Sequence, residues 1–297
     1  MKARTHGLGL ALIAALVSGF AVFVNGYGVR AWTATTDATT YTTVKNVVAA
    51  IILFVLALAT SRGRRPMQAL SSTVRWPLLF VAVLGGAVAF VLFFEGLAAA
   101  TSSQAAFIHK TLIVWVAIMA PLVLGERRRW FHGLAIVLLV VGQVIMTGGL
   151  SGFSWGRGEW LILAATLLWS GEVVLAKRLL SEIDPRDLAV VRMGGGAAVL
   201  LVWGLVRGGL ATIDLITAQQ WGWVLLTGCV LAGYVATWFT ALAHAPAVDV
   251  TAVLVGGAVV TALLQSGFSA VPLPSPIGLV LVAVGALMLP LLARRTA

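Results

Sequence analysis

The chain has 297 residues, of which 60% are hydrophobic and only 10% are charged. An ordinary soluble domain has about 25% charged residues, so this composition excludes a soluble globular protein. The net charge of +10 is scattered over many short segments, which is typical of loops facing anionic lipid and not of a nucleic-acid-binding surface.

Ten apolar stretches follow one another along the chain, and each is close to the roughly 20 residues that a helix needs to cross a bilayer. They are continuously apolar, without the alternation of a β-barrel strand. The first could be a secretory signal peptide, but its apolar region is long and no small-residue cleavage site follows it, so we interpret it as a span. We predict membrane helices at 7–29, 43–60, 76–99, 103–124, 130–148, 160–179, 188–206, 221–242, 248–270 and 275–292.

Basic residues between these stretches favour one face of the membrane. With the N-terminus inside, fourteen Lys and Arg residues lie in cytoplasmic segments, and only Arg30, Arg157 and Arg207 lie outside. Cytoplasmic loops carry an excess of such residues. We therefore expect a multi-pass protein of the bacterial inner (cytoplasmic) membrane with both termini in the cytoplasm. The fourteen are Lys2, Arg4, Arg62, Arg64, Arg65, Arg75, Arg127, Arg128, Arg129, Lys177, Arg178, Arg186, Arg294 and Arg295.

The ten stretches form two sets of five that match in order, with separations of 152, 147, 145 and 143 residues. An odd number of spans per set threads the second copy through the membrane from the opposite side. We therefore predict an all-α integral membrane protein: ten transmembrane helices as two inverted five-helix repeats, 1–149 and 150–297, around a central cavity. The matched pairs are Ser18 with Ser170, Lys45 with Arg192, Phe94 with Phe239, and Gly142 with Gly285.

One block is especially characteristic of a known family. Between Phe94 and Gly148 it contains a small-residue hairpin, Leu124-Gly125-Glu126 and a pair of spaced glycines. The hairpin and the glycines recur in the second half, where Pro272-Leu273-Pro274 replaces the Gly-Glu pair. With these features the chain resembles EamA-type ten-helix members of the drug/metabolite transporter superfamily, over nearly its whole length.

The resemblance implies two five-helix bundles around a cavity lined by the first, third, fourth, sixth, eighth and ninth helices. The fifth and tenth helices would pack outside, as scaffold or dimer contacts, so a monomer or homodimer is expected. Small residues let helix backbones approach closely, which suits the glycines of these two helices. Those glycines are Gly133, Gly142, Gly278 and Gly285.

Five ionisable residues fall inside the predicted spans, where a charge costs about 2.5–3.5 kcal/mol on insertion scales. Lys110 and Glu95 flank a hairpin at comparable depth and are expected to pair. The pair is either a structural salt bridge or a site at which Lys110, next to His109, meets an anionic group while Glu95 holds a cation or proton. The other three are Lys45, Glu172 and Arg192.

Lys45 and Arg192 are equivalent in the repeat and close to helix ends, so we interpret them as structural or gate charges. Glu172 matches an apolar residue, Phe20, in the first half. Burial favours the neutral form of a carboxyl group, so Glu172 is a candidate for proton coupling. Its alternative role is an ion pair with Lys177 or the neighbouring arginine.

Further residues are candidates for other roles. Glu126 precedes the fifth helix by about three residues, where a carboxylate complements a helix N-terminus, and we interpret it as a gate or fold element. Aromatic side chains in cavity helices could stack on a substrate or simply pack. The remaining substrate-binding candidates are Asn25, Trp115, Trp169, Tyr234, Trp238 and Gln265.

These features predict a secondary transporter and no enzyme. The chain has neither a Walker phosphate-binding motif nor a hydrolytic constellation, and its single Cys229 forms no disulfide or thiol metal site. We expect no catalytic residue, metal or cofactor, and no nucleic-acid partner; the partners are a small-molecule substrate and the lipid bilayer.

For the substrate, the resemblance favours small polar metabolites, amino acids or related compounds, with export by alternating access as the expected direction. The mixed charges would suit a zwitterion. An anionic (phosphorylated or carboxylate) metabolite, bound by Lys45, Lys110 and His109, is an alternative. A lipid-handling or scaffold membrane protein is another.

Overall fold

The computed structural model describes residues 2–60, 72–126, 130–146, 148, 155–269 and 271–295. Within these ranges the chain is helical and has no strand, as the composition predicts. Eight helices are long and apolar enough to cross a membrane, and two shorter apolar helices, Trp130–Met146 and Pro276–Met288, accompany them. The described part of the protein is therefore all-helical, and its helices have the length and composition of membrane-spanning helices.

Each predicted apolar stretch coincides with one helix or with a helix that is interrupted once or twice. The first half contains α1 (Lys2–Thr33), α2 (Ala38–Ala59), α3 (Ser72–Phe80), the π-helix η1 (Val81–Val88), α4 (Ala89–Ala99), α5 (Ser102–Lys110), α6 (Leu112–Leu124) and α7 (Trp130–Met146). The second half contains α8 (Arg157–Leu179), α9 (Pro185–Val206), the 3-10 helix η2 (Gly209–Leu215), α10 (Ala218–His244), α11 (Ala247–Val255), α12 (Gly257–Phe268) and α13 (Pro276–Arg295).

The helices α2 and α9 begin with the same local chemistry. Asp37 caps α2 by accepting a hydrogen bond from a backbone N–H of the first turn, and Asp184 does the same for α9. Aspartate is among the preferred N-cap residues because its carboxylate satisfies an otherwise unpaired N–H. Both ends of α9 lie 147 residues after the corresponding ends of α2. The two helices thus keep the register that the repeat predicts.

The fourth and ninth predicted spans are both interrupted, and at equivalent points. Thr111 separates α5 from α6, and Gly256 separates α11 from α12. The starts of α5 and α11 and the two interruptions are each 145 residues apart. Discontinuous helices at corresponding positions of two halves are a recurrent feature of secondary transporters near their substrate sites.

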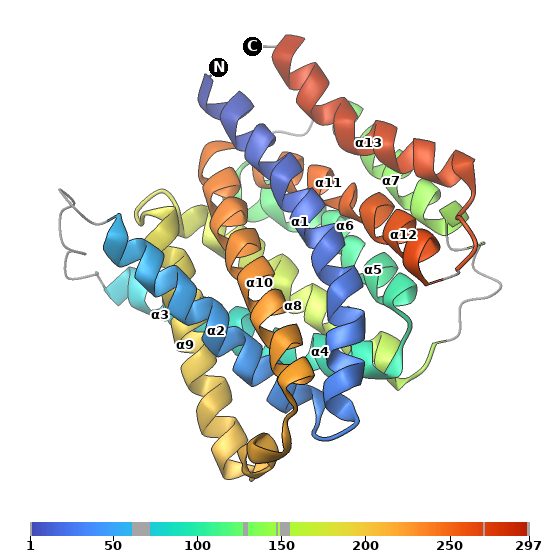
Figure 1. Ribbon diagram of the computed structural model, residues 1–297. Coiled ribbons are helices and arrows are strands. Elements are labelled where there is room, and N and C mark those ends of the chain that lie inside the picture. The colour runs from blue at the N-terminus through green and yellow to red at the C-terminus, as the bar shows by residue number, and fades with distance from the viewer. Residues whose placement is uncertain are drawn as a thin grey trace.

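In space, α1 begins and α13 ends at the same end of the bundle, which we call the terminal end (Figure 1). The helices α2 and α9 pack together and run in opposite directions (Figure 1). Large apolar side chains such as Leu122 and Val206 remain exposed on the outside, as expected of a surface in contact with lipid.

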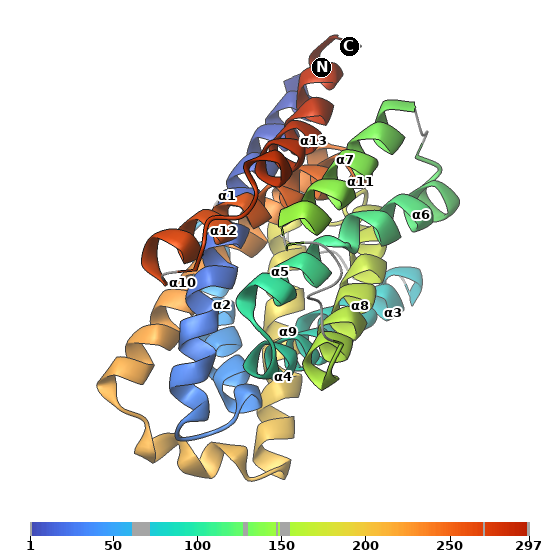
Figure 2. The ribbon, with the colours of Figure 1, turned by 90° about the vertical axis from the view of Figure 1, so that its right-hand side faces the viewer.

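The helices α7 and α13 pack along each other at one side of the bundle (Figure 2). A Cβ on Gly142 would lie 3.0 Å from the carbonyl oxygen of Gly278, and one on Gly278 would lie 2.9 Å from that of Gly142. Gly285 is similarly close to α7, so the expected packing role is confirmed for these three glycines. A Cβ on Gly133 would meet no atom within 4 Å, so Gly133 makes no such close contact within the described part of the chain.

Candidate functional site

A cavity lies in the middle of the bundle, and side chains from both halves of the chain line it. Its described wall comes from α1, α2, α4, α5, α6, α8, α9 and α10. The resemblance predicted neither the second nor the seventh span, here α2 and α9, as part of the wall. It predicted the ninth span, yet neither α11 nor α12 contributes to the described lining.

An ion pair between Glu172 of α8 and Arg192 of α9 forms one part of this wall. The guanidinium is bidentate: Nε donates to Glu172 Oε1, and Nη2 donates to Oε2 at 2.9 Å. Both residues are more than nine-tenths buried. The geometry holds both carboxylate oxygens on one cation. The alternative that Glu172 pairs with Lys177 or Arg178 is therefore wrong.

The π-helix η1 fits around this ion pair. The carbonyl oxygen of Gly85 accepts hydrogen bonds from Arg192 Nη2 at 3.2 Å and from Trp169 Nε1 at 3.0 Å. A Cβ on Gly85 would collide with the carboxyl group of Glu172, and one on Gly86 with the backbone of Arg192. Short π-helical segments are rare and frequently mark functional sites.

Sequence reasoning missed Gly85 and Gly86. A double glycine inside an otherwise bulky apolar span was the available signal, because glycine in a helix interior costs up to about 1 kcal/mol relative to alanine and needs a reason.

Lys45 of α2 lies elsewhere in the same wall and is 1% exposed. Its Nζ is 3.2 Å from the ring centroid of Phe94 and 5.4 Å from those of Tyr41 and Phe90. The distance from Nζ to Asn25 Oδ1 is 3.5 Å, at the limit of a hydrogen bond. The ammonium group is therefore stabilised mainly by aromatic faces.

A short polar network fixes Asn25. The Tyr41 hydroxyl donates to Asn25 Oδ1 at 2.8 Å and lies 3.0 Å from Thr227 Oγ1. Asn25 Nδ2 donates to the carbonyl oxygen of Ala21 at 2.8 Å. Buried polar groups need such partners, and here they orient the Asn25 carbonyl oxygen towards Lys45.

The prediction that Lys110 pairs with Glu95 is wrong. Lys110 Nζ donates to Ser18 Oγ at 2.9 Å, and Glu95 Oε1 accepts from Thr39 Oγ1 at 2.7 Å. The two helices of a hairpin fix only depth, whereas the direction of each side chain around its helix decides the partner.

The cavity brings together eight of the residues singled out from the sequence. They are Asn25, Lys45, His109, Trp169, Glu172, Arg192, Tyr234 and Trp238. Four others lie outside its described lining: Glu95, Lys110, Trp115 and Gln265. Several basic residues used for the orientation lie outside the described residues: Arg62, Arg64, Arg65, Arg127, Arg128 and Arg129.

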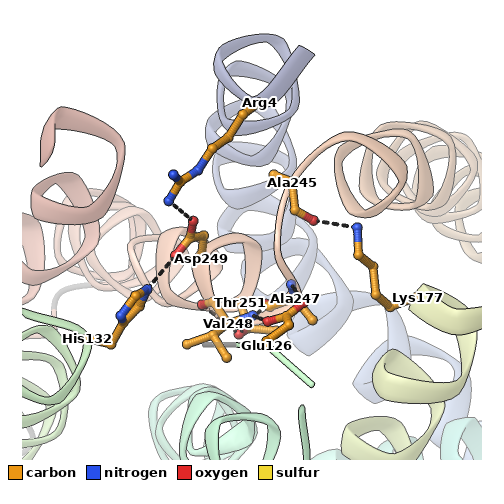
Figure 3. Close-up of polar contacts among 9 residues, drawn as sticks. All are labelled: Arg4, Glu126, His132, Lys177, Ala245, Ala247, Val248, Asp249 and Thr251. Carbon is orange, nitrogen blue, oxygen red and sulfur yellow. Dashed lines mark hydrogen bonds and ion pairs between the residues drawn. The ribbon is translucent and has the colours of Figure 1, made fainter. Parts of the chain in front are cut away.

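A second polar cluster lies towards the terminal end (Figure 3). Asp249, in the first turn of α11, is fully buried and accepts a hydrogen bond from Arg4 Nη2 at 2.7 Å. His132 Nε2 of α7 lies 3.1 Å from its other carboxylate oxygen. Sequence reasoning missed Asp249, although a carboxylate in the first turn of a predicted span was a visible signal.

Glu126 contacts α11, which lies in the other half of the chain (Figure 3). Its carboxylate accepts hydrogen bonds from the backbone N–H groups of Ala247 at 2.7 Å and Val248 at 3.4 Å. It therefore stabilises the N-terminus of α11 in the second half. Its predicted role at the start of the fifth helix involves residues 127–129, which lie outside the described residues. Lys177 Nζ donates to the carbonyl oxygens of Leu242 and Ala245 next to this point.

Comparisons with known proteins agree with this arrangement. A model of the EamA-like transporter family matches residues 5–148 and again residues 156–290. An uncharacterized transporter of Methanothermobacter thermautotrophicus is 30% identical over 138 residues, which are 44% of this chain and 40% of that protein. A known crystal structure shares the fold with a TM-score of 0.72, covering 96% of this chain and 97% of its own at 17% sequence identity.

Two matches of the family model together cover most of the sequence, so the chain belongs to the EamA-like transporter family of the drug/metabolite transporter superfamily. The family and the relative bear the names of transporters and not of enzymes. The match with this relative spans less than half of the relative's length.

Proposed function

We propose that this protein is a secondary transporter that moves small polar metabolites across the cytoplasmic membrane by alternating access through the central cavity. The observation that carries the proposal is the cavity itself, in which Lys45, Glu172 and Arg192 are enclosed by helices from both halves. Charged groups inside a membrane are tolerated where they face a cavity or a partner, and they mark substrate pathways. Amino acids or related compounds, moved outwards, are the cargo that the family resemblance favours.

The helix arrangement supports ten transmembrane helices in two inverted repeats. The antiparallel course of α2 and α9 and the equivalent interruptions at Thr111 and Gly256 are what an inverted duplication produces (Figure 1). In this topology the shorter helices α7 and α13 cross the membrane as the fifth and tenth transmembrane helices. The excess of basic residues in the segments at the terminal end supports a cytoplasmic position for that end in a bacterial cell.

The cytoplasmic gate is closed by α11 in this conformation. All nine residues of α11 are buried, and its start is held by Arg4, Glu126 and His132 from the first half. Contacts between the halves at one end of a central site are what a gate must make and break. Transport then requires release of these contacts, which opens the cavity towards the cytoplasm.

Transport by purified protein in proteoliposomes tests this proposal. A panel of metabolites is measured by counterflow, with empty liposomes as background. Trp238→Ala removes an aromatic side chain from the cavity wall, whereas Trp160→Ala removes one that is 59% exposed at the start of α8. We expect saturable uptake that Trp238→Ala reduces and Trp160→Ala does not. Equal activity of the two variants would reject the cavity as the route.

A further inference from the structure

Lys45 and Arg192 occupy equivalent positions that converge on one aromatic ring. Each is the eighth residue of a helix capped by an aspartate, Lys45 in α2 and Arg192 in α9. Lys45 Nζ lies 5.4 Å from the ring centroid of Phe90, and the guanidinium carbon of Arg192 lies 5.2 Å from it. The two halves of the chain therefore contribute one cation each to the same cavity.

The two cations differ in their counter-charge. Arg192 has Glu172 as a bidentate partner. The residue that the repeat matches to Glu172 in the first half is Phe20, which is 37% exposed and carries no charge. All ten carboxylates of the side chains belong to described residues, and none of them lies within ion-pair distance of Lys45. At the position equivalent to Glu172, the first half thus has no carboxylate that could pair with Lys45.

The ammonium group of Lys45 also has unused hydrogen-bonding capacity. It has three N–H donors, and within the described part of the chain its acceptor is Asn25 Oδ1 at 3.5 Å. A buried charge without a counter-charge is unfavourable. An anionic group in the cavity would supply both the charge and the acceptors.

We propose that Lys45 binds the carboxylate of a monoanionic substrate. The substrate carboxylate then pairs with Lys45 in the first half as Glu172 pairs with Arg192 in the second half. This inference rests on the proposed transport function and changes its cargo from a zwitterionic amino acid to a monocarboxylate. The rest of the substrate is apolar and about as large as an aromatic ring, because the rest of the wall is rich in aromatic side chains. These include Phe90, Phe93, Phe94, Trp169, Trp238 and Phe239.

The same wall disfavours the other charge types. An amine or the ammonium group of a zwitterion needs an anion, and the carboxylate in the wall, Glu172, has both oxygens on Arg192. A phosphate ester at neutral pH carries a charge near −2, for which Lys45 alone is an incomplete partner. Lys110, the other buried lysine, is outside the described lining and donates to Ser18.

Equilibrium binding to the purified protein tests this assignment, with quenching of tryptophan fluorescence as the signal. Trp169 and Trp238 in the wall report on the cavity. The probes are a matched set with one aromatic body: 3-phenylpropionate, phenylalanine, phenethylamine and phenyl phosphate, together with aliphatic monocarboxylates of graded length. Lys45→Met removes the cation, and Arg30→Gln removes a charge from an exposed position at the end of α1.

We expect a monocarboxylate to bind at least about tenfold more tightly than the matched zwitterion, amine and phosphate. The amine has no anionic oxygen to accept a charge-assisted hydrogen bond from Lys45. The zwitterion would bury an ammonium group, and the phosphate a second negative charge, without a partner in the described wall. Lys45→Met should abolish that preference while its circular dichroism spectrum stays unchanged, and Arg30→Gln should retain it. Lys45→Arg should restore part of the affinity if Lys45→Met misfolds.

Tighter binding of the amine or zwitterion, carboxylate binding that survives Lys45→Met, or no binding of any carboxylate would overturn the assignment. Counterflow of any other solute would leave the transport function standing in each of these cases. Absence of counterflow for every solute, with carboxylate binding intact, would instead reject transport and retain the binding site.

Discussion

Glu126 accepts a hydrogen bond at 2.7 Å from the backbone N–H of Ala247, which lies 121 residues further along the chain. The contact joins the end of α6 in the first half to the start of α11 in the second. A helix N-terminus has unpaired N–H groups and a partial positive charge, and a carboxylate satisfies both. Since α11 forms the gate in the proposed transport cycle, the stability of this one helix start bears on gating.

Glu126→Ala should therefore destabilise the protein. Loss of a capping carboxylate costs about 1 kcal/mol, which corresponds to a fall of a few degrees in the apparent midpoint of thermal unfolding in detergent. Glu182→Ala, which removes an exposed carboxylate between α8 and α9, is the matched control and should leave the midpoint unchanged. Equal midpoints for the two variants would show that the contact contributes nothing.

Asp249→Asn should open the terminal end more readily. The substitution removes the charge that holds Arg4 at 2.7 Å and weakens the contact with His132, so the three helices α1, α7 and α11 separate at lower cost. The measurement is labelling of Ser18→Cys in the cavity wall by an impermeant maleimide added from the side of the terminal end, in a Cys229→Ser background. We expect labelling to be several-fold faster.

The control for this experiment is Asp214→Asn, an exposed carboxylate of η2 at the opposite end of α9 from its capping aspartate. It should leave the labelling rate unchanged. Slower labelling in Asp249→Asn would mean that the cluster holds the gate open and not closed.

The fold could be predicted from the sequence because membrane helices are encoded locally. About 20 apolar residues and their polar ends determine a span, and the order of matched residues, such as Lys45 with Arg192, indicates the repeat. The predicted stretches coincide with the helices for this reason. The interruption at Thr111 was not predictable in the same way, since no proline or glycine marks it.

For the site, the sequence could predict which charged residues take part but not which partners they contact. The cost of a buried charge singled out Lys45, Glu172 and Arg192 without reference to any contact. Their partners depend on how helices are rotated and tilted against each other, which sequence spacing does not determine. Spacing therefore suggested Glu95 for Lys110, whereas the packing of α5 against α1 places Ser18 there.

The ion pair of Glu172 and Arg192 gives a prediction that separates a structural role from proton coupling. Removing one partner of a buried pair leaves an uncompensated charge and costs about 3–5 kcal/mol. Glu172→Gln and Arg192→Gln should each lower the unfolding midpoint strongly, and the double variant should recover part of the loss. Additive losses would contradict a direct pair.

Transport separates the two roles further. If Glu172 carries a proton, Glu172→Gln retains counterflow exchange and loses its response to a pH gradient. The ion pair favours the other outcome: because both carboxylate oxygens bind Arg192, we expect counterflow and gradient-driven transport to fall together. A selective loss of the response to pH would assign proton coupling to Glu172 after all.

Gly85 provides the sharpest test of the cavity wall, because a matched glycine lies in the helix packed against it. A Cβ on Gly85 would collide with the carboxyl group of Glu172, whereas a Cβ on Gly171 of α8 would meet no atom within 4 Å. Gly85→Ala should therefore displace Glu172 and the donors of Arg192 and Trp169 from the Gly85 carbonyl. Overpacking of this kind typically costs about 1–3 kcal/mol.

Gly171→Ala should be neutral or stabilising by up to about 1 kcal/mol, since alanine is the better helix former and the space is open. The measurements are the unfolding midpoint and the counterflow rate of each variant. We expect Gly85→Ala to lower both and Gly171→Ala to lower neither. If Gly85→Ala transports like the unmodified protein, the close fit between η1 and the ion pair has no part in the transport cycle. The wall would then tolerate a methyl group next to the carboxyl group of Glu172 without any loss of transport.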